Sequence, residues 1–115
     1  MDFFDITSHI EMLSSNVKEG IAIVHVKGAT PGLLFTSSPE SEIDSLLSFI
    51  VPLDREYEHG NAYAHLRSTI LSTTVVIPIN NGKPITGARR VYILEIEPKI
   101  RSREIIITIV TTDHS

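Results

Sequence analysis

Runs of β-branched and other apolar residues constrain the fold of this chain more than any other feature. They lie at Ile21–Val26, Thr73–Ile79, Val91–Glu97 and Glu104–Thr111, with a brief run at Leu33–Phe35. Branching at Cβ favours extended backbone. Each run therefore predicts a strand, and the first, apolar on both faces, predicts an interior strand.

Three details refine the strand prediction. Asn80-Asn81-Gly82 supplies positive φ at low cost and predicts a hairpin turn. His25 is the one polar residue of its run, and we expect a hydrogen-bonded core or interface histidine there rather than a catalytic group. Along Val91–Glu97 two sets of residues alternate, so that each set lies on one face of the expected strand; this predicts one buried and one wetter face. The sets are Tyr92, Leu94 and Ile96 against Ile93, Glu95 and Glu97.

Three other segments have helical signals. Ser8-x-x-Glu11 predicts a capping box for a helix over about Ser8–Ser15. Ser38-Pro39 predicts the start of a second helix, which ends at Pro52. Asn61 predicts the N-cap of a third helix over about Ala62–Leu71. The apolar set of the second helix is Ile43, Leu46, Leu47 and Ile50.

The composition limits the class of protein. Hairpins mixed with three helices, without a repeated βαβ unit, predict a single α+β domain over residues 1–115. The absence of cysteine excludes thiolate metal sites and disulfides, and we expect a cytoplasmic protein. No stretch approaches the roughly 20 apolar residues that cross a bilayer, so no membrane partner is expected. A net charge of −4 makes nucleic acid an unexpected partner as well.

One segment indicates a family. Gly60-Asn61-Ala62-Tyr63-Ala64-His65-Leu66-Arg67-Ser68 leads into a strand that contains Val76-Ile77-Pro78-Ile79. This order resembles the YjbQ-like family of secondary thiamine-phosphate synthases, in which GN-A-AHLK-S precedes a VxLPV strand, a DG turn and a G-T-W-Q motif. The resemblance extends from Asp5 to Val110 and is strongest over Gly60 to Gly87.

The resemblance implies a compact β-sandwich of mainly antiparallel strands with about three flanking helices, assembled as a homo-trimer. Family members usually begin with an additional strand ahead of the stretch that is Asp5-Ile6-Thr7 here. We therefore expect a truncated N-terminal strand and an exposed sheet edge, which another chain can pair with. Continuous apolar strands in a small domain also favour burial in an oligomer.

The resemblance also implies the site. The family histidine falls on His65 and the family asparagine on Asn61. His59 matches a second histidine if two residues are deleted relative to the family's Y-x-H-D-E-G-N, whereas an ungapped alignment leaves it unmatched; we favour the deletion. His65 and His59 are thus the catalytic candidates, and Asn61 and Arg67 are substrate-binding candidates. A solvent-facing Arg67 is the alternative for that residue.

His59 and His65 are also the candidates for a divalent metal cofactor. Such a site needs at least a third ligand, for which Glu56, Glu58 and His25 are available. Two histidines without a recognised spacing are a weak metal signal. The alternative is that both form surface or helix-cap hydrogen bonds.

Several family residues are replaced. The family histidine and glutamate of H-T-T/S-A-G-x-T-x-N-E-N correspond to Gly28 and Ser37, which can neither bind a metal through a ring nitrogen nor supply a carboxylate. Gly87-Ala88-Arg89-Arg90 replaces G-T-W-Q. Arg89 and Arg90 are candidates to clamp phosphate. Alternatively, only one of them faces a given pocket, because consecutive strand residues point to opposite faces.

Two functions follow from the resemblance. The first is a divergent YjbQ-like protein with weak thiamine-phosphate synthase-type activity on phosphorylated small molecules and a partly degraded site. The second is a non-catalytic ligand-binding or structural subunit, in a homo-oligomer or in a hetero-oligomer with a full-length relative. Loss of the family's histidine and glutamate, at the positions of Gly28 and Ser37, argues against efficient turnover.

Overall fold

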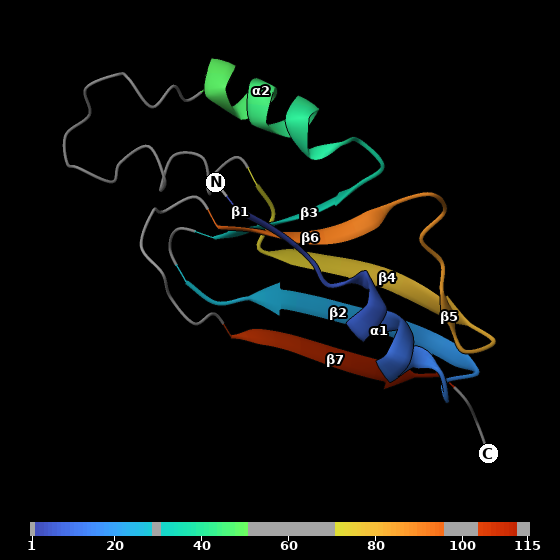
Figure 1. Cartoon of the computed structure of the whole chain (residues 1–115). Helices are drawn as coiled ribbons and strands as arrows, with labels where there is room; N and C mark the ends of the chain where they lie inside the picture. Colours follow the sequence, from blue (N-terminus) through green and yellow to red (C-terminus); the bar gives the residue numbers. More distant parts are fainter. Residues whose placement is uncertain (1, 29–30, 51–70, 96–103, 113–115) are drawn as a thin grey trace.

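The computed structural model describes residues 2–28, 31–50, 71–95 and 104–112, which form two helices and seven strands in two antiparallel sheets (Figure 1). The first sheet has the order β1 (Asp2–Asp5), β6 (Arg90–Glu95), β3 (Gly32–Thr36). The second has the order β5 (Lys83–Pro84), β4 (Thr74–Asn80), β2 (Glu19–Val26), β7 (Ile105–Thr111). The predicted α+β sandwich is confirmed.

The core lies between the two sheets. Both sheets and the first helix, α1 (Thr7–Ser14), contribute apolar side chains to one buried cluster. Its members are Ile6, Ile10, Ala22, Val24, Val26, Leu33, Val75, Ile77, Ile79, Val91 and Ile93. Because residues that are far apart in the chain meet here, the core depends on long-range pairing of strands.

β2 is the interior strand that its composition predicts. It pairs with β4 on one side and with β7 on the other. Ala22 and Val24 are fully buried in the core, whereas Ile21 and Ile23, on the opposite face, are half-buried. His25 shares that second face, and its Nδ1 lies 2.9 Å from Thr74 Oγ1, so the predicted hydrogen bond is confirmed, although His25 is not a core residue.

The predicted helix over about Ser8–Ser15 is confirmed as α1, Thr7–Ser14, but its start is not capped as the sequence predicts. Its N-cap is Ile6, and no side chain caps it, so the capping box of Ser8 and Glu11 is wrong. Tertiary contacts decide the boundary instead: Ile6 is buried, and its N–H donates to the carbonyl of Val91 at 2.9 Å. The backbone N–H of Thr7 donates to Asp5 Oδ1 at 2.9 Å. The helix thus starts where the chain leaves the first sheet.

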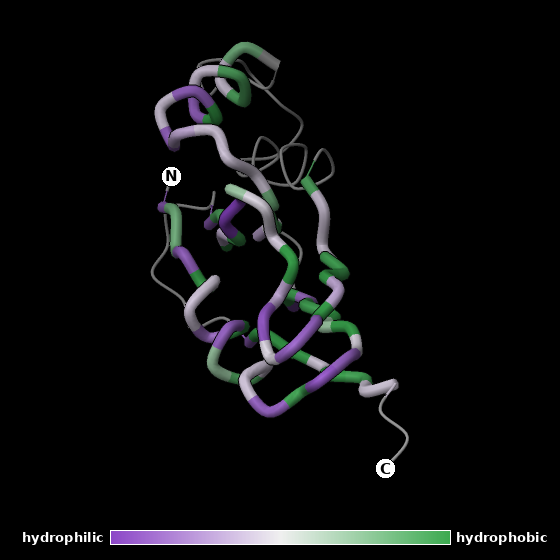
Figure 2. The backbone as a smooth tube through the Cα atoms, turned by 90° about the vertical axis from the view of Figure 1, so that its right-hand side faces the viewer, coloured by the Kyte–Doolittle hydropathy of each residue, from purple (hydrophilic) through white to green (hydrophobic). Residues whose placement is uncertain are grey.

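The second helix, α2 (Glu40–Ile50), covers the outer face of the first sheet (Figure 1). Ile43 and Leu47 pack there against Leu94 in a second, smaller cluster. Figure 2 shows both hydrophobic (green) and hydrophilic (purple) residues along this helix. The predicted apolar stripe is wrong at Leu46, which is 58% exposed and is not part of the cluster that Ile43 and Leu47 form with Leu94. Phe49, at 86% exposed, also points away from the sheet.

β6 has one buried and one wetter face, as its alternation predicts: on the side opposite Ile93 and Glu95, Arg90 is exposed and Tyr92 is half-buried. Ile93 and Glu95 lie on the side that faces the core, and both are buried. Leu94 is fully buried on the other side because α2 covers it. The sequence pattern could not reveal a cover that comes from another part of the chain.

The first sheet has a strand ahead of Asp5-Ile6-Thr7. β1 forms its edge and pairs with β6 from Asp2↔Glu95 to Asp5↔Tyr92. The third predicted helix, over Ala62–Leu71, lies outside the described residues except for its last position.

The predicted hairpin turn between β4 and β5 is confirmed. Asn81 and Gly82 both have positive φ, at 51° and 75°, as a tight two-residue hairpin requires. The turn also contacts the segment after α1: the N–H of Gly82 donates to the carbonyl of Val17 at 2.7 Å. A Cβ added at Gly82 would lie 2.6 Å from the carbonyl oxygen of Ser15. Glycine is therefore required here for both conformation and space.

We predict that Gly82→Ala lowers the free energy of unfolding by about 3 kcal/mol, since it adds a clash with Ser15 to the cost of positive φ. Gly87→Ala is the matched control. Gly87 also has positive φ, 64°, but a Cβ there would meet nothing within 4 Å, so we expect a loss of about 1 kcal/mol. Urea unfolding of both variants measures the difference, and equal losses would contradict the role of Ser15.

Candidate functional site

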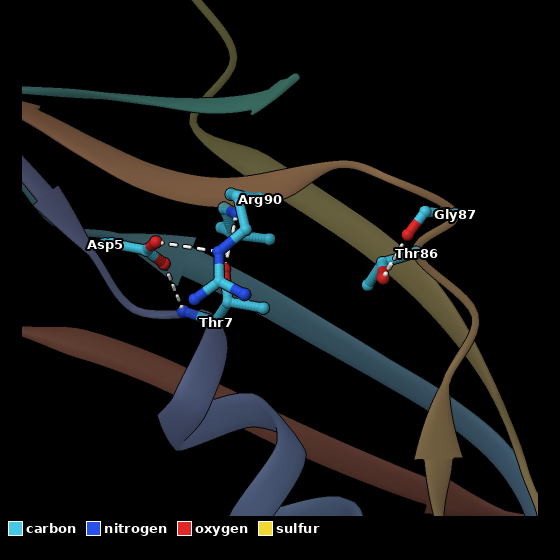
Figure 3. Close-up of polar contacts among 6 residues, drawn as sticks. Asp5, Thr7, Thr86, Gly87 and Arg90 are labelled. Atoms are coloured by element: carbon cyan, nitrogen blue, oxygen red, sulfur yellow. Dashed lines mark hydrogen bonds and ion pairs between the residues drawn. The ribbon is translucent and has the colours of Figure 1, made fainter. Parts of the chain in front are cut away.

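Asp5, Thr7 and Arg90 form a polar network that joins β1, α1 and β6 (Figure 3). Arg90 Nε donates to Asp5 Oδ2 at 2.8 Å, and the second carboxylate oxygen of Asp5 accepts the Thr7 N–H. Thr7 Oγ1 in turn accepts the N–H of Val91 at 2.8 Å. Arg90, predicted to bind substrate, is thus held by a carboxylate of its own chain.

The network shifts the ionisation of its members. Partial burial alone would raise the pKa of the Asp5 carboxyl, but hydrogen bonds from Arg90 and Thr7, together with the charge of Arg90, outweigh it and hold that pKa below its usual value. The hydrogen bond to Asp5 raises the pKa of Arg90. The side chains of Arg90 and Asp5 remain 45% and 35% exposed, so solvent weakens the attraction.

Arg89 lies differently from its neighbour. Its guanidinium carbon lies 5.4 Å from the centre of the Phe35 ring, at a distance where a cation and an aromatic face attract. Its N–H donates to the carbonyl of Thr86 at 3.3 Å, which closes the turn before β6. Arg89, but not Arg90, is among the described residues that line the cavity at this turn.

That cavity, here called the Arg89 cavity, has a volume of about 330 Å³. The cavity lies between Ser37, just after β3, and the connection from β5 to β6. The described residues that line it are Ser37, Ile85, Thr86, Gly87, Ala88 and Arg89. It therefore combines one guanidinium with two residues that carry hydroxyl groups. Ser37 stands where the resemblance places a glutamate. Because serine replaces that glutamate, none of these lining residues carries a carboxylate that would repel an anion.

Gly28, the other replaced position, is separated from the Arg89 cavity by the length of β3. Gly28 precedes β3 and Ser37 follows it. The strand spans roughly 13 Å between Gly32 and Thr36 at 3.3 Å per residue. Gly28 has a φ of 124°, a conformation that a histidine would adopt only under strain. The backbone here suits glycine.

The remaining predicted site residues, His59, Asn61, His65 and Arg67, lie outside the described residues. The chain that follows them returns beside the Gly28 end of the sheets. There the N–H of Leu33 donates to the carbonyl of Ser72 at 2.6 Å, and the N–H of Val26 donates to that of Thr73 at 3.1 Å. The described chain therefore brings Gly28 and the residues just after the signature to one end, and Arg89 and Ser37 to the other.

The predicted metal site stays a prediction. Within residues 2–28, 31–50, 71–95 and 104–112, no three histidine, aspartate or glutamate side chains gather into a set that could hold a metal ion. The ligands named from the sequence, His59 and His65, are not among these residues. Sequence reasoning also missed the Asp5–Arg90 pair and the contact of Arg89 with Phe35, for which a single sequence has no signal, because the partners are far apart in the chain.

Comparison with known proteins identifies the family. The family model described as UPF0047 protein YjbQ-like matches residues 1–112. A UPF0047 protein of Archaeoglobus fulgidus is 29% identical over 93% of this chain and 90% of its own length. One from Methanocaldococcus jannaschii is 32% identical over 75% of this chain and 68% of its own. The chain therefore belongs to the YjbQ-like UPF0047 family, as its signature segment predicts.

A solved structure supports the same assignment. A YjbQ/UPF0047 family protein from Clostridium acetobutylicum superimposes with a TM-score of 0.82 at 28% identity, and the match covers 95% of this chain and 91% of that one. In the part of the chain that is described, no helix has the length and apolar character needed to span a membrane.

We predict that Asp5→Asn lowers stability by about 1 kcal/mol at pH 7, because it removes one partner of an exposed ion pair. The folded pKa of Asp5 lies below its unfolded value near 3.9, so the pair stabilises the fold above that pH. The contribution disappears as pH falls through the folded pKa. Thermal unfolding from pH 7 to pH 2 should show wild type and variant converging in acid.

Asp2→Asn, on the same strand, is the control for loss of charge alone. It should change the melting temperature little at any pH, since Asp2 takes no part in the network with Arg90. A difference between wild type and Asp5→Asn that persists unchanged at pH 2 would contradict the ionic origin of the effect.

Proposed function

We propose that this chain is a divergent YjbQ-like protein that binds a phosphorylated small molecule, with the phosphate on Arg89. The observation that supports it is the Arg89 cavity, where a guanidinium and the residues Ser37 and Thr86 line one volume of about 330 Å³. A guanidinium can donate two parallel hydrogen bonds to phosphate oxygens, and hydroxyl groups can donate to a third. A small phosphate ester suits this volume.

Phe35 supports the proposed role of Arg89. The ring lies 5.4 Å from the guanidinium carbon and limits the positions that this long side chain samples. An arginine that is held before the ligand arrives loses less conformational entropy on binding. Arg90 remains a secondary candidate, since Asp5 accepts from its Nε and a guanidinium has further N–H donors.

The proposed catalytic activity is weak thiamine-phosphate synthase-type turnover. The family resemblance implies condensation of a pyrimidine pyrophosphate with a thiazole phosphate. Arginine charge would stabilise the departing phosphate, and His65 would assist proton transfer or bind a divalent metal with His59. Gly28 and Ser37 lack the groups that the family pattern has there, which supports slow turnover or none. The proposal includes a cytoplasmic location, in keeping with a chain that has no cysteine.

We predict that Arg89→Gln weakens binding of glycerol 3-phosphate at least tenfold, because the neutral amide replaces a charge-assisted contact with phosphate. Glycerol, which lacks the phosphate, should bind weakly to both proteins. Isothermal titration calorimetry of the purified full chain measures these affinities. Lys27→Gln is the control, since Lys27 pairs with Glu104 outside the Arg89 cavity. Equal affinity of wild type and Arg89→Gln would refute the phosphate site.

A synthase assay separates catalysis from binding. His65→Ala should abolish any product formed from the pyrimidine pyrophosphate and the thiazole phosphate, while it leaves the affinity for glycerol 3-phosphate unchanged. Product formation that survives His65→Ala would overturn the catalytic part of the proposal and leave the binding part to its own test.

The alternative function is a structural subunit of an oligomer, a homo-trimer or an assembly with a full-length relative. The outer face of the second sheet favours it. Val76 is 56% exposed there, and Ile23 lies beside it as its registered partner. Ile106 and Val110 of β7, at 43% and 44% exposed, extend the apolar surface. An apolar patch shared by three strands is typical of surfaces that contact another protein.

We predict that Val76→Glu reduces the molar mass of the assembly, because a buried, unpaired charge strongly disfavours an interface. Size-exclusion chromatography with light scattering measures the mass, and circular dichroism checks that the fold persists. Ser45→Glu, which adds the same charge to the exposed side of α2, is the control and should leave the mass unchanged. An assembly that keeps its mass in Val76→Glu would exclude this face as the contact.

A further inference from the structure

We propose that a second cavity, between α1 and the β4–β5 hairpin, binds a small amino carboxylate. This hairpin cavity has a volume of about 390 Å³. The described residues that line it are Glu11, Gly82, Lys83, Pro84 and Thr86. Its lining therefore includes one carboxylate and one ammonium group, which complement the amine and the acid of a zwitterion. This site is independent of the proposed phosphate site, although Thr86 borders both cavities.

The two charges of the hairpin cavity are not used within the described structure. The ion pairs found there join Lys27 to Glu104 and Arg90 to Asp5. The side chains of Glu11 and Lys83 form neither an ion pair nor a hydrogen bond with any residue of the described ranges. Opposite charges that share a cavity without neutralising each other leave both available to a ligand.

Arg90 does not take the place of the ammonium group that we propose to bind at Glu11. Its positive charge is close enough to Glu11 to contribute to the raised pKa of the guanidinium. Its Nε, however, donates to Asp5 Oδ2 at 2.8 Å, so the nearest carboxylate already balances the charge. Glu11 therefore keeps its capacity to accept a hydrogen bond from an ammonium group in the hairpin cavity.

The backbone fixes the positions of the two residues that carry these charges. Ile10, directly before Glu11, is fully buried in the core and anchors α1. The hairpin is tied to the end of that helix, since the N–H of Gly82 donates to the carbonyl of Val17 and the N–H of Asn81 to that of Lys18. Lys83 follows this turn directly. A site whose walls are already placed requires less ordering when a ligand binds.

The size and lining set the class of ligand. A volume of about 390 Å³ lies at the lower end of the range of ligand pockets. Pro84 adds an apolar surface to the lining, which suits a short methylene chain. An amino carboxylate with its two charges separated by a few carbons meets all three requirements: an ammonium at Glu11, methylenes at Pro84 and a carboxylate at Lys83.

The test compares three probes of nearly equal size on the full chain: 4-aminobutyrate, butylamine and butyrate. Their binding is followed by NMR titration of the backbone amides of Gly82, Lys83 and Thr86. Wild type should bind 4-aminobutyrate roughly tenfold more tightly than either singly charged probe, because only the zwitterion satisfies both charges. Glu11→Gln should remove the advantage of the amine and leave butyrate binding unchanged. Lys83→Gln should weaken the binding of butyrate and of 4-aminobutyrate and leave the binding of butylamine unchanged.

Glu42→Gln, on α2 and outside the lining residues of the hairpin cavity, is the matched control and should bind all three probes as wild type does. Equal affinity for the three probes, no shift at these amides, or an effect of Glu42→Gln as large as that of Glu11→Gln would overturn the proposal. Arg89→Gln should not change the binding of 4-aminobutyrate. The proposal for this site and the proposal for the phosphate site are therefore tested independently.

Discussion

The position of β2 between β4 and β7 is the constraint on which the rest of the structure depends. Its seven registered pairs with each neighbour bring segments together that are about fifty to ninety residues apart in the chain. Its buried residues alternate strictly, so a shift of register by one would turn Ala22 and Val24 out of the core. The half-buried outer face with Ile21 and Ile23 also follows from this pairing.

α1 connects that sheet to the candidate sites. Ile10 anchors it in the core, while Asp5 and Arg90 bind its start to the first sheet. The backbone after its end holds the hairpin turn at Gly82. The hairpin cavity lies along this helix, and the β5–β6 connection that leaves the hairpin forms much of the wall of the Arg89 cavity. The two cavities thus share Thr86 as a lining residue.

Local chemistry explains which parts of the fold the sequence predicts. β-Branched runs mark the strands, and Asn81-Gly82 marks the hairpin, because these preferences belong to the residues themselves. The predictions that are wrong concern features that depend on contacts with other segments of the chain. Ser8 does not cap α1, since the strand contacts of Ile6 place the boundary earlier. Glu95 is buried although it is charged, because it lies on the face of β6 that is turned to the core, the face of Val91 and Ile93.

The same division holds for the site. The sequence by itself determined the family, through the signature from Gly60 to Ser68 and the strand that follows, and it determined that Gly28 and Ser37 lack the family's chemical groups. Only the tertiary structure decided that Arg90 is held by Asp5 while Arg89 faces a cavity. The physical reason is that a side chain's partner depends on strand pairing and helix packing between distant segments, which local residue preferences do not encode.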